Sequence, residues 1–262
     1  MKHILIACMW VLPMVAVAAP TTPPDIASLL APDVDHSATF AFAGNGVIQG
    51  SGAVDLPKRH VARNATGSYS KNKLAFWASA DIAPDGSKAI DGHASALWEK
   101  SDAGWKLIAF SIVPTATAKQ QQAANKQGLL PPKIRDANGA GGDYFLTVFD
   151  KVFGNDAVDT VSDHKDAVMF GSGPGERYVG GDAIKKVLTG WNLAFTMRDG
   201  IASGVTKGRL LWIAANMNAR PANNDKAAAT PYRVFLIFEG SGDSDYQLVH
   251  ASFAAMTEQA WP

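Results

Sequence analysis

Cysteine is nearly absent from this chain of 262 residues, since Cys8 is the single one. Cys8 lies in an apolar N-terminal stretch, so a mature protein without that stretch has no thiol for a disulfide, a metal site or nucleophilic catalysis. An excess of either charge is also lacking, because 24 basic residues balance 24 acidic ones. No run of basic residues is flanked by aromatics, which argues against a nucleic acid as partner.

Sequence signatures of common catalytic and metal sites are missing too. No H-E-x-x-H motif occurs, and Asp35-His36 and Asp163-His164 are adjacent pairs, whose side chains would point to opposite faces of a strand. We therefore expect no metal and no cofactor. Ser172 lies between two glycines but lacks the glycine two residues before it that a nucleophile elbow requires.

The N-terminal stretch, residues 1–19, is MKHILIACMWVLPMVAVAA, with a lysine near its start and small residues at Ala16 and Ala18. This order is typical of a secretory signal peptide cleaved after Ala18. Leu5-Ile-Ala-Cys8 has the form of a lipoprotein box, the alternative, but only seven residues precede Cys8. No later apolar run approaches the roughly 20 residues of a membrane span. We expect a periplasmic or secreted protein with no membrane insertion after cleavage.

Two similar halves flank a region without aromatic residues. Residues 115–142 are rich in Ala, Gln and Gly and indicate a linker, with a long loop inside one domain as the alternative. Three pairs of segments align across this linker: 74–80 with 210–216, 105–111 with 246–252, and 40–50 with 170–180. The sequence therefore predicts two divergent copies of one module, over residues 25–114 and 143–262.

The second copy predicts helices first and strands afterwards. Apolar residues recur at helical spacing over 143–153, and a second helix is expected from Asp182, as its N-cap, to Trp191. A short strand is expected at 167–170, and three long ones at 210–218, 232–239 and 246–253, the last two joined as a hairpin. In the first copy, we expect only a reduced opening helix over 25–30 and a short second helix within 58–66.

These elements and motifs resemble the SnoaL-like branch of the NTF2-like, or ketosteroid-isomerase-like, family. The resemblance rests on Phe170-Gly-x-Gly-Pro-Gly-Glu-x-Tyr-x-Gly180 before a helix, on Leu211-Trp-Ile-Ala214, and on Tyr246-Gln-Leu-Val-His-Ala-Ser252. It covers residues ~143 to 256 well and ~33 to 114 weakly, with the first copy degenerate. It implies an α+β fold of two cone modules, each a curved antiparallel sheet wrapped around helices.

The glycine-rich stretch 170–181, FGSGPGERYVGG, is not expected to bind phosphate. It lacks the lysine of a phosphate-binding loop, and Glu176 places a carboxylate where an anion would have to approach. Glycines there instead indicate a tight crossing from strand to helix with positive φ at several positions.

His250 is the candidate catalytic residue, since it interrupts an otherwise apolar strand. The strand period of two places His250 on one face with Tyr246, Leu248 and Ser252. The resemblance implies that polar residues of the terminal strand contact a ligand, where a histidine would serve as general acid or base. A core histidine bonded to the backbone is the alternative. The predicted ligand-binding residues are Trp191, Trp212, Phe235, Ile237 and His250.

Three functions remain open at this stage. The first is an exported domain that binds a small apolar molecule in a pocket of the second copy. The second is a non-catalytic association module that uses its sheet face, as an intrachain pseudo-dimer or a homodimer. The third is an isomerase or cyclase with acid–base chemistry, although the carboxylate and tyrosine set of ketosteroid isomerase cannot be placed. A pocket requires His250 and Trp212 to face a cavity, whereas association buries them.

Overall fold

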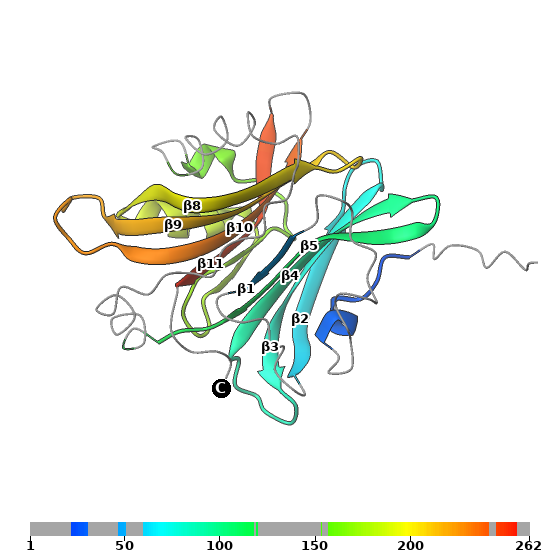
Figure 1. The fold of residues 1–262 in the computed structure, drawn as a ribbon, viewed down its shortest axis with the longest axis horizontal. Coiled ribbons are helices and arrows are strands. Elements are labelled where there is room, and N and C mark those ends of the chain that lie inside the picture. Colours follow the sequence, from blue (N-terminus) through cyan, green and yellow to red (C-terminus); the bar gives the residue numbers. More distant parts are fainter. Residues whose placement is uncertain are drawn as a thin grey trace, which may run out of the picture.

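Two β-sheets dominate the computed structural model of the chain, which describes residues 22–30, 47–50, 60–117, 119, 153, 157–240 and 245–255 (Figure 1). The first sheet contains β1 (Val47–Gly50), β2 (His60–Tyr69), β3 (Ala75–Pro84), β4 (Gly92–Ser101) and β5 (Gly104–Pro114). The second contains β6 (Val168–Phe170), β7 (Arg177–Val179), β8 (Leu193–Val205), β9 (Leu210–Pro221), β10 (Thr230–Gly240) and β11 (Tyr246–Ala255). Within the described ranges, the helical elements whose bounds are defined are the 3-10 turns η1 (Ile26–Leu30) and η2 (Ala157–Thr160) and the helix α3 (Gly181–Gly190).

The two sheets share one strand order. The first runs β1-β5-β4-β3-β2 and the second β7-β6-β11-β10-β9-β8, with a short strand parallel to the last strand of each. All other pairings are antiparallel. Val47 lies opposite Ala109 as Val168 lies opposite His250. By this register β1 corresponds to β6. The predicted alignment of 40–50 with 170–180 is therefore wrong. Among the described residues, β7 has no counterpart in the first sheet.

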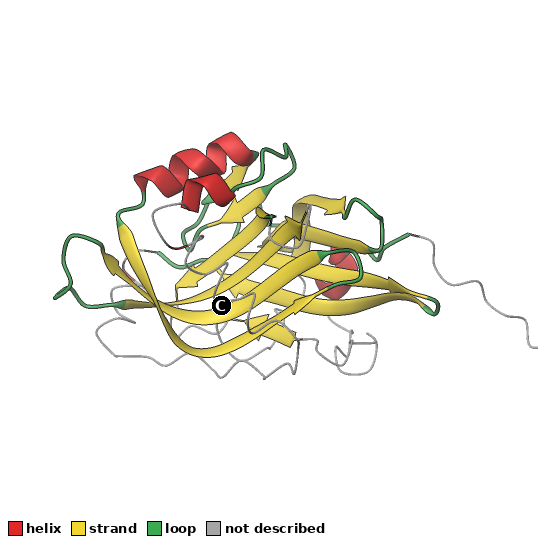
Figure 2. Ribbon diagram, turned by 90° about the horizontal axis from the view of Figure 1, so that it is seen from above, coloured by secondary structure: helices red, strands yellow, loops and turns green. Residues whose placement is uncertain are grey.

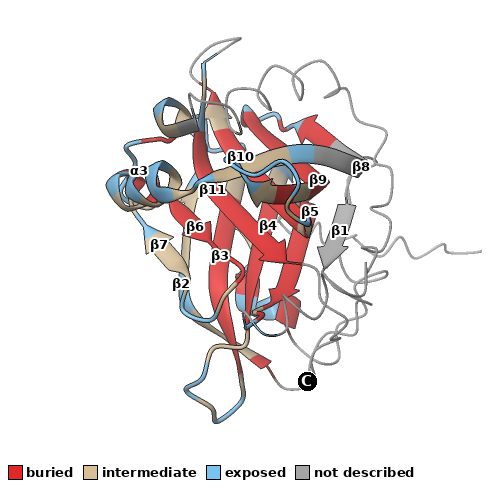
Figure 3. Ribbon diagram, turned by 90° about the vertical axis from the view of Figure 1, so that its left-hand side faces the viewer, coloured by how far each residue is buried: buried red, intermediate tan, exposed pale blue. Residues whose placement is uncertain are grey.

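The sheets pack face to face around a shared apolar core. That core joins Trp77, Leu97 and Ile108 of the first sheet to Trp212 and Phe235 of the second. The first sheet's other face is covered by η1. The second sheet's other face packs against α3, which Figure 2 shows lying over the strands. Figure 3 shows the strands at this interface as the most buried part of the molecule. The predicted α+β class with antiparallel sheets is confirmed.

A bulge at the same place in each final strand sets which residues face the interface. On β5, Leu97 pairs with Ala109 and Trp98 with Leu107, which leaves Ile108 as the extra residue. On β11, Ile237 pairs with His250 and Phe238 with Leu248, which leaves Val249 extra. A bulge interrupts the alternation of side chains. Val249 and His250 therefore both face the interface, while Leu248 packs on the α3 side of the sheet.

Several expected elements differ in the structure. The short helix within 58–66 is wrong, because β2 occupies His60–Tyr69 and pairs with β3. Helix α3 has Gly180, at φ 87°, as its N-cap, so Asp182 lies in the first turn instead. The three long strands and the hairpin are confirmed, and β8 was missed. The signal peptide, most of the linker and the helix over 143–153, except Phe153, lie outside the described residues. None of the described helices is long and apolar enough to cross a membrane.

Candidate functional site

Four of the five predicted ligand-binding residues lie at the interface between the sheets. Trp212, Phe235, Ile237 and His250 have exposed fractions of 1% or less. They share the interface face because Trp212 pairs with Ile237 across β9 and β10, and Ile237 pairs with His250 across β10 and β11. Their neighbours are residues of the first sheet, so the structure places them in packed core and not along a cavity.

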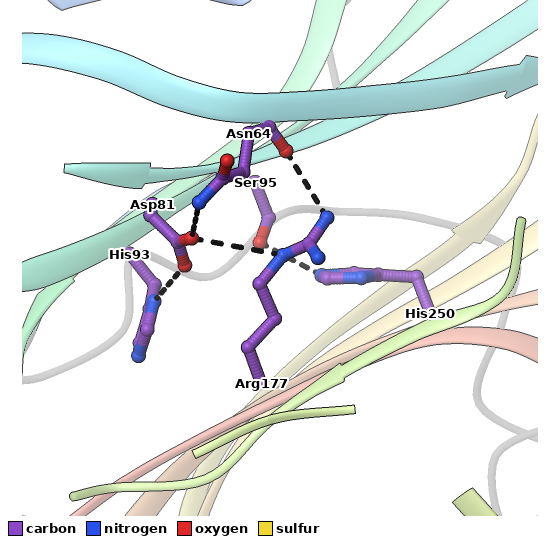
Figure 4. Close-up of polar contacts among 6 residues, drawn as sticks. All are labelled: Asn64, Asp81, His93, Ser95, Arg177 and His250. Carbon is purple, nitrogen blue, oxygen red and sulfur yellow. Dashed lines mark hydrogen bonds and ion pairs between the residues drawn. The ribbon is translucent and has the colours of Figure 1, made fainter. Parts of the chain in front are cut away.

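The imidazole of His250 is enclosed by aromatic rings and one hydroxyl. Its ring stacks on Trp77 with centroids 5.4 Å apart and meets Phe170 edge-on at 5.8 Å. Nε2 lies 2.7 Å from Oγ of Ser95, which is buried on β4 (Figure 4). Burial lowers the pKa of His250 to about 3, against a smaller opposite effect of the Val168 backbone. The ring is therefore neutral at physiological pH, and it is fully buried.

The predicted face of β11 is wrong, and the bulge at Val249 is the reason. Tyr246 and Leu248 pack on the α3 side, whereas His250 contacts the first sheet. A strict period of two would have placed all three together. The extra residue moves His250 to the opposite face from Leu248.

A second polar group joins the sheets beside His250. Asp81 of β3 lies 3.2 Å from Nδ1 of His93, and its other oxygen accepts a hydrogen bond from Asn64 at 2.7 Å. Arg177 reaches across from β7, with Nε 3.8 Å from Asp81 and Nη2 donating to the Asn64 carbonyl at 3.0 Å (Figure 4). Burial alone would raise the pKa of Asp81, but hydrogen bonds from His93 and Asn64, with the charges of His93 and Arg177, lower it overall.

Local backbone geometry positions this group. Asn64 has φ 50° where the pairing of β2 and β3 shifts between Arg63 and Thr66. Asparagine tolerates this left-handed conformation better than most residues. The irregularity aims the Asn64 side chain at Asp81 and leaves its carbonyl to the guanidinium of Arg177. The result is a polar bridge between elements more than 100 residues apart.

A separate cavity of about 370 Å³ opens on the α3 side of the second sheet. One wall is apolar, made by Trp191, Leu193, Phe195 and Phe253. The lining residues with polar side chains are Thr117, Ser172, Glu176 and Tyr232. Of the residues predicted to bind a ligand, the structure places only Trp191 here. It immediately follows α3, whose C-cap it forms.

The glycine-rich stretch forms the polar end of this cavity. It is a turn between β6 and β7, closed by a bond from the Gly171 N–H to the Glu176 carbonyl at 2.8 Å. The Glu176 carboxylate folds back and accepts the Gly173 N–H at 2.7 Å. A Cβ on Gly171 would lie 2.2 Å from Glu176 Oε2. A side chain at Gly171 would therefore displace the Glu176 carboxylate, which folds back over Gly171 and Gly173.

The charge of Glu176 contributes to raised pKa values of two tyrosines, Tyr178 and Tyr232. Burial, followed by the Glu176 carboxylate, raises the pKa of Tyr178. Burial also raises the pKa of Tyr232, with a further rise from Glu176 and an opposing hydrogen bond to the Ser172 side chain. The Tyr232 hydroxyl is thus neutral, and it lines the same cavity as the Glu176 carboxylate and the aromatic side chains.

The sequence carried a weak signal for these residues. In the sequence, Glu176 argues only against the binding of an anion. Tyr232, Phe195 and Phe253 belong to no motif that indicates a ligand site. Trp191 and Phe195 are four residues apart, a spacing that would bring two side chains together on a helix. Both residues follow the end of α3, however, so helical spacing does not apply to them. Among the described residues, no three His, Cys, Asp or Glu side chains are grouped as metal ligands.

Comparison with known proteins gives a similarity of fold. No protein-family model matches the sequence, and no functionally curated protein does. A putative ketosteroid isomerase from Parabacteroides distasonis is similar at 9% identity, with 46% of this chain and 91% of that chain covered and a TM-score of 0.36. An NTF2-like protein of unknown function from Pseudomonas putida has 12% identity, 45% and 87% coverage and a TM-score of 0.32.

A third solved structure comes from Salmonella enterica serovar Typhimurium and is an NTF2-like superfamily protein. Its identity is 12%, it covers 55% of this chain and 96% of its own, and its TM-score is 0.33. In each case the aligned part is about half of this chain. Many of the structural neighbours are NTF2-like or ketosteroid-isomerase-like proteins.

Proposed function

We propose that this protein binds a small, largely apolar molecule in the cavity beside α3. The carrying observation is the cavity itself, whose volume of about 370 Å³ is lined both by the aromatic and aliphatic side chains of the apolar wall and by polar groups of comparable extent. Ligand sites of proteins commonly have this size. The proposed site differs from the predicted one, since it keeps Trp191 and replaces the interface residues by Phe195, Tyr232 and Phe253.

The packing of the sheets favours ligand binding in the cavity over association with another chain through the sheet face. The interface face of the second sheet is covered by the first sheet of the same chain. Turns also meet there: the Lys207 N–H donates to Glu99 at 2.6 Å and the Lys71 N–H to Glu239 at 3.1 Å. We propose that the first sheet takes the place of a second subunit, as an intrachain pseudo-dimer, and that the protein works after export.

Acid–base catalysis is a second candidate that one observation favours. The Glu176 carboxylate and the Tyr232 hydroxyl line the same cavity, and each is held by a hydrogen bond from or to the glycine-rich turn. A reaction would therefore use these two groups and not His250. Binding remains the function that the geometry supports directly, and catalysis would be added to it.

Binding is tested with N-phenyl-1-naphthylamine, a neutral apolar fluorophore. We expect saturable fluorescence enhancement with one site per chain. Leu193→Trp fills the cavity and should weaken binding roughly tenfold or more. Leu74→Trp is the matched control, because Leu74 is 38% exposed and outside the cavity. Equal binding by both variants, or no saturable binding by the wild type, would overturn the proposal.

A further inference from the structure

The cavity carries one charge and several aromatic rings. Among the described residues that line it, Glu176 alone is charged at neutral pH. The carboxylate is half-buried and accepts the Gly173 N–H, which fixes it at the polar end. Anionic molecules are therefore disfavoured by repulsion, and a neutral molecule would leave the charge without a counter-ion.

No protein cation neutralises this carboxylate within the described part of the chain. The adjacent Arg177 is directed away, toward Asp81 and Asn64 of the first sheet. Lys185 of α3 is paired with Asp163 on the exposed side of the helix. Among the described residues, therefore, none supplies a cation to Glu176.

The rings opposite Glu176 are suited to the same charge. Trp191 meets Phe253 edge-on, with centroids 4.9 Å apart and planes at 83°. Phe195 meets Tyr232 at 6.3 Å and 68°. Rings set at steep angles present both faces and edges to the cavity. A ring face attracts a cation, and the attraction is strongest for tryptophan. A metal ion, by contrast, needs several oxygen ligands, and this wall supplies carbon.

We propose that the cavity binds an organic cation, an ammonium ion with apolar substituents, with its charge between the Glu176 carboxylate and the Trp191 ring. The substituents would contact Phe195 and Phe253. This inference rests on the proposed function of the same cavity and adds the chemical class of the ligand.

The test compares two molecules of one shape in the full chain. Benzyltrimethylammonium and neopentylbenzene differ in the replacement of a charged nitrogen by carbon. Calorimetry should show the cation binding roughly tenfold more tightly, as desolvated cation–aromatic and charge contacts allow. Glu176→Gln keeps an acceptor for Gly173 and should bring this ratio close to one without weakening neopentylbenzene. Asp182→Asn, at an exposed position of α3, removes one charge elsewhere and should preserve the ratio.

A second variant guards against a folding defect in the first. Trp191→Leu keeps an apolar wall but removes the ring, and should weaken the cation more than neopentylbenzene. If neopentylbenzene binds as tightly as the cation to the wild type, the ammonium inference is overturned and the cavity's binding function stands. If neither molecule binds and the fluorophore also fails, the proposed function is overturned, and the inference with it.

Discussion

Acidification should destabilise this protein through His250. The pKa of His250 is about 3 in the folded protein and 6.5 ordinarily. Between these pH values the unfolded chain therefore binds a proton at His250, while the folded chain does not. Stability is then present above pH 6.5 and is lost as the pH falls toward 3. Between pH 7 and pH 4 the pKa difference covers about 2.5 units, which corresponds to about 3 kcal/mol. That is a large part of the ~5–15 kcal/mol that stabilises most domains.

The assay is urea unfolding, followed by tryptophan fluorescence, at several pH values between 4 and 7. The comparison is between the wild type and His250→Gln, which removes the titrating ring and keeps a polar contact for Ser95. We expect the wild type to lose about 3 kcal/mol more than the variant over this range. His164→Gln, at a side chain that is 42% exposed, serves as control and should keep the wild-type dependence. Equal pH dependence in the wild type and His250→Gln would refute the reasoning.

Three other changes test the interface and the cavity. Arg177→Met removes the polar bridge between the sheets and should cost roughly 2 kcal/mol in urea unfolding, whereas Lys185→Met, at an exposed pair, should leave the unfolding midpoint nearly unchanged. Gly208→Ala would place a Cβ 2.4 Å from its nearest neighbour in the first sheet and should cost about 1–3 kcal/mol, while Gly190→Ala meets nothing within 4 Å and should be tolerated. Ultraviolet titration should show a tyrosine that ionises above its usual pH of 10 and disappears in Tyr232→Phe. Similar losses within either matched pair, or an unchanged titration, would contradict these expectations.

Local patterns predicted the long strands of the second half. The apolar runs at 210–218, 232–239 and 246–253 are continuous enough to specify buried strands, and they lie within β9, β10 and β11. Trp212, Phe235 and Ile237 share one face of the second sheet. What covers that face was not predictable from their spacing, because Trp77 and Ile108 come from a sheet more than 100 residues earlier.

Two other failures have local causes. The bulge at Val249 adds one residue to β11, and nothing in YQLVHASF marks which residue is extra, so the side assignments from His250 onward are reversed relative to Leu248. Strand β2, with the sequence HVARNATGSY, lacks clean alternation because it lies at the sheet edge and is only partly buried. Glu176 was missed because its partner is the Gly173 N–H, a backbone group that a residue pattern does not display.

The cavity beside α3, and not the interface between the sheets, is expected to hold the small molecule. A titration of the ¹⁵N-labelled chain with N-phenyl-1-naphthylamine, observed by amide and indole resonances, distinguishes the two places. We expect shifts at the Trp191 indole and at the amides of Gly173 and Glu176, with the Trp77 and Trp212 indoles unchanged. Shifts centred on Trp77 and Trp212, with Trp191 unmoved, would contradict it.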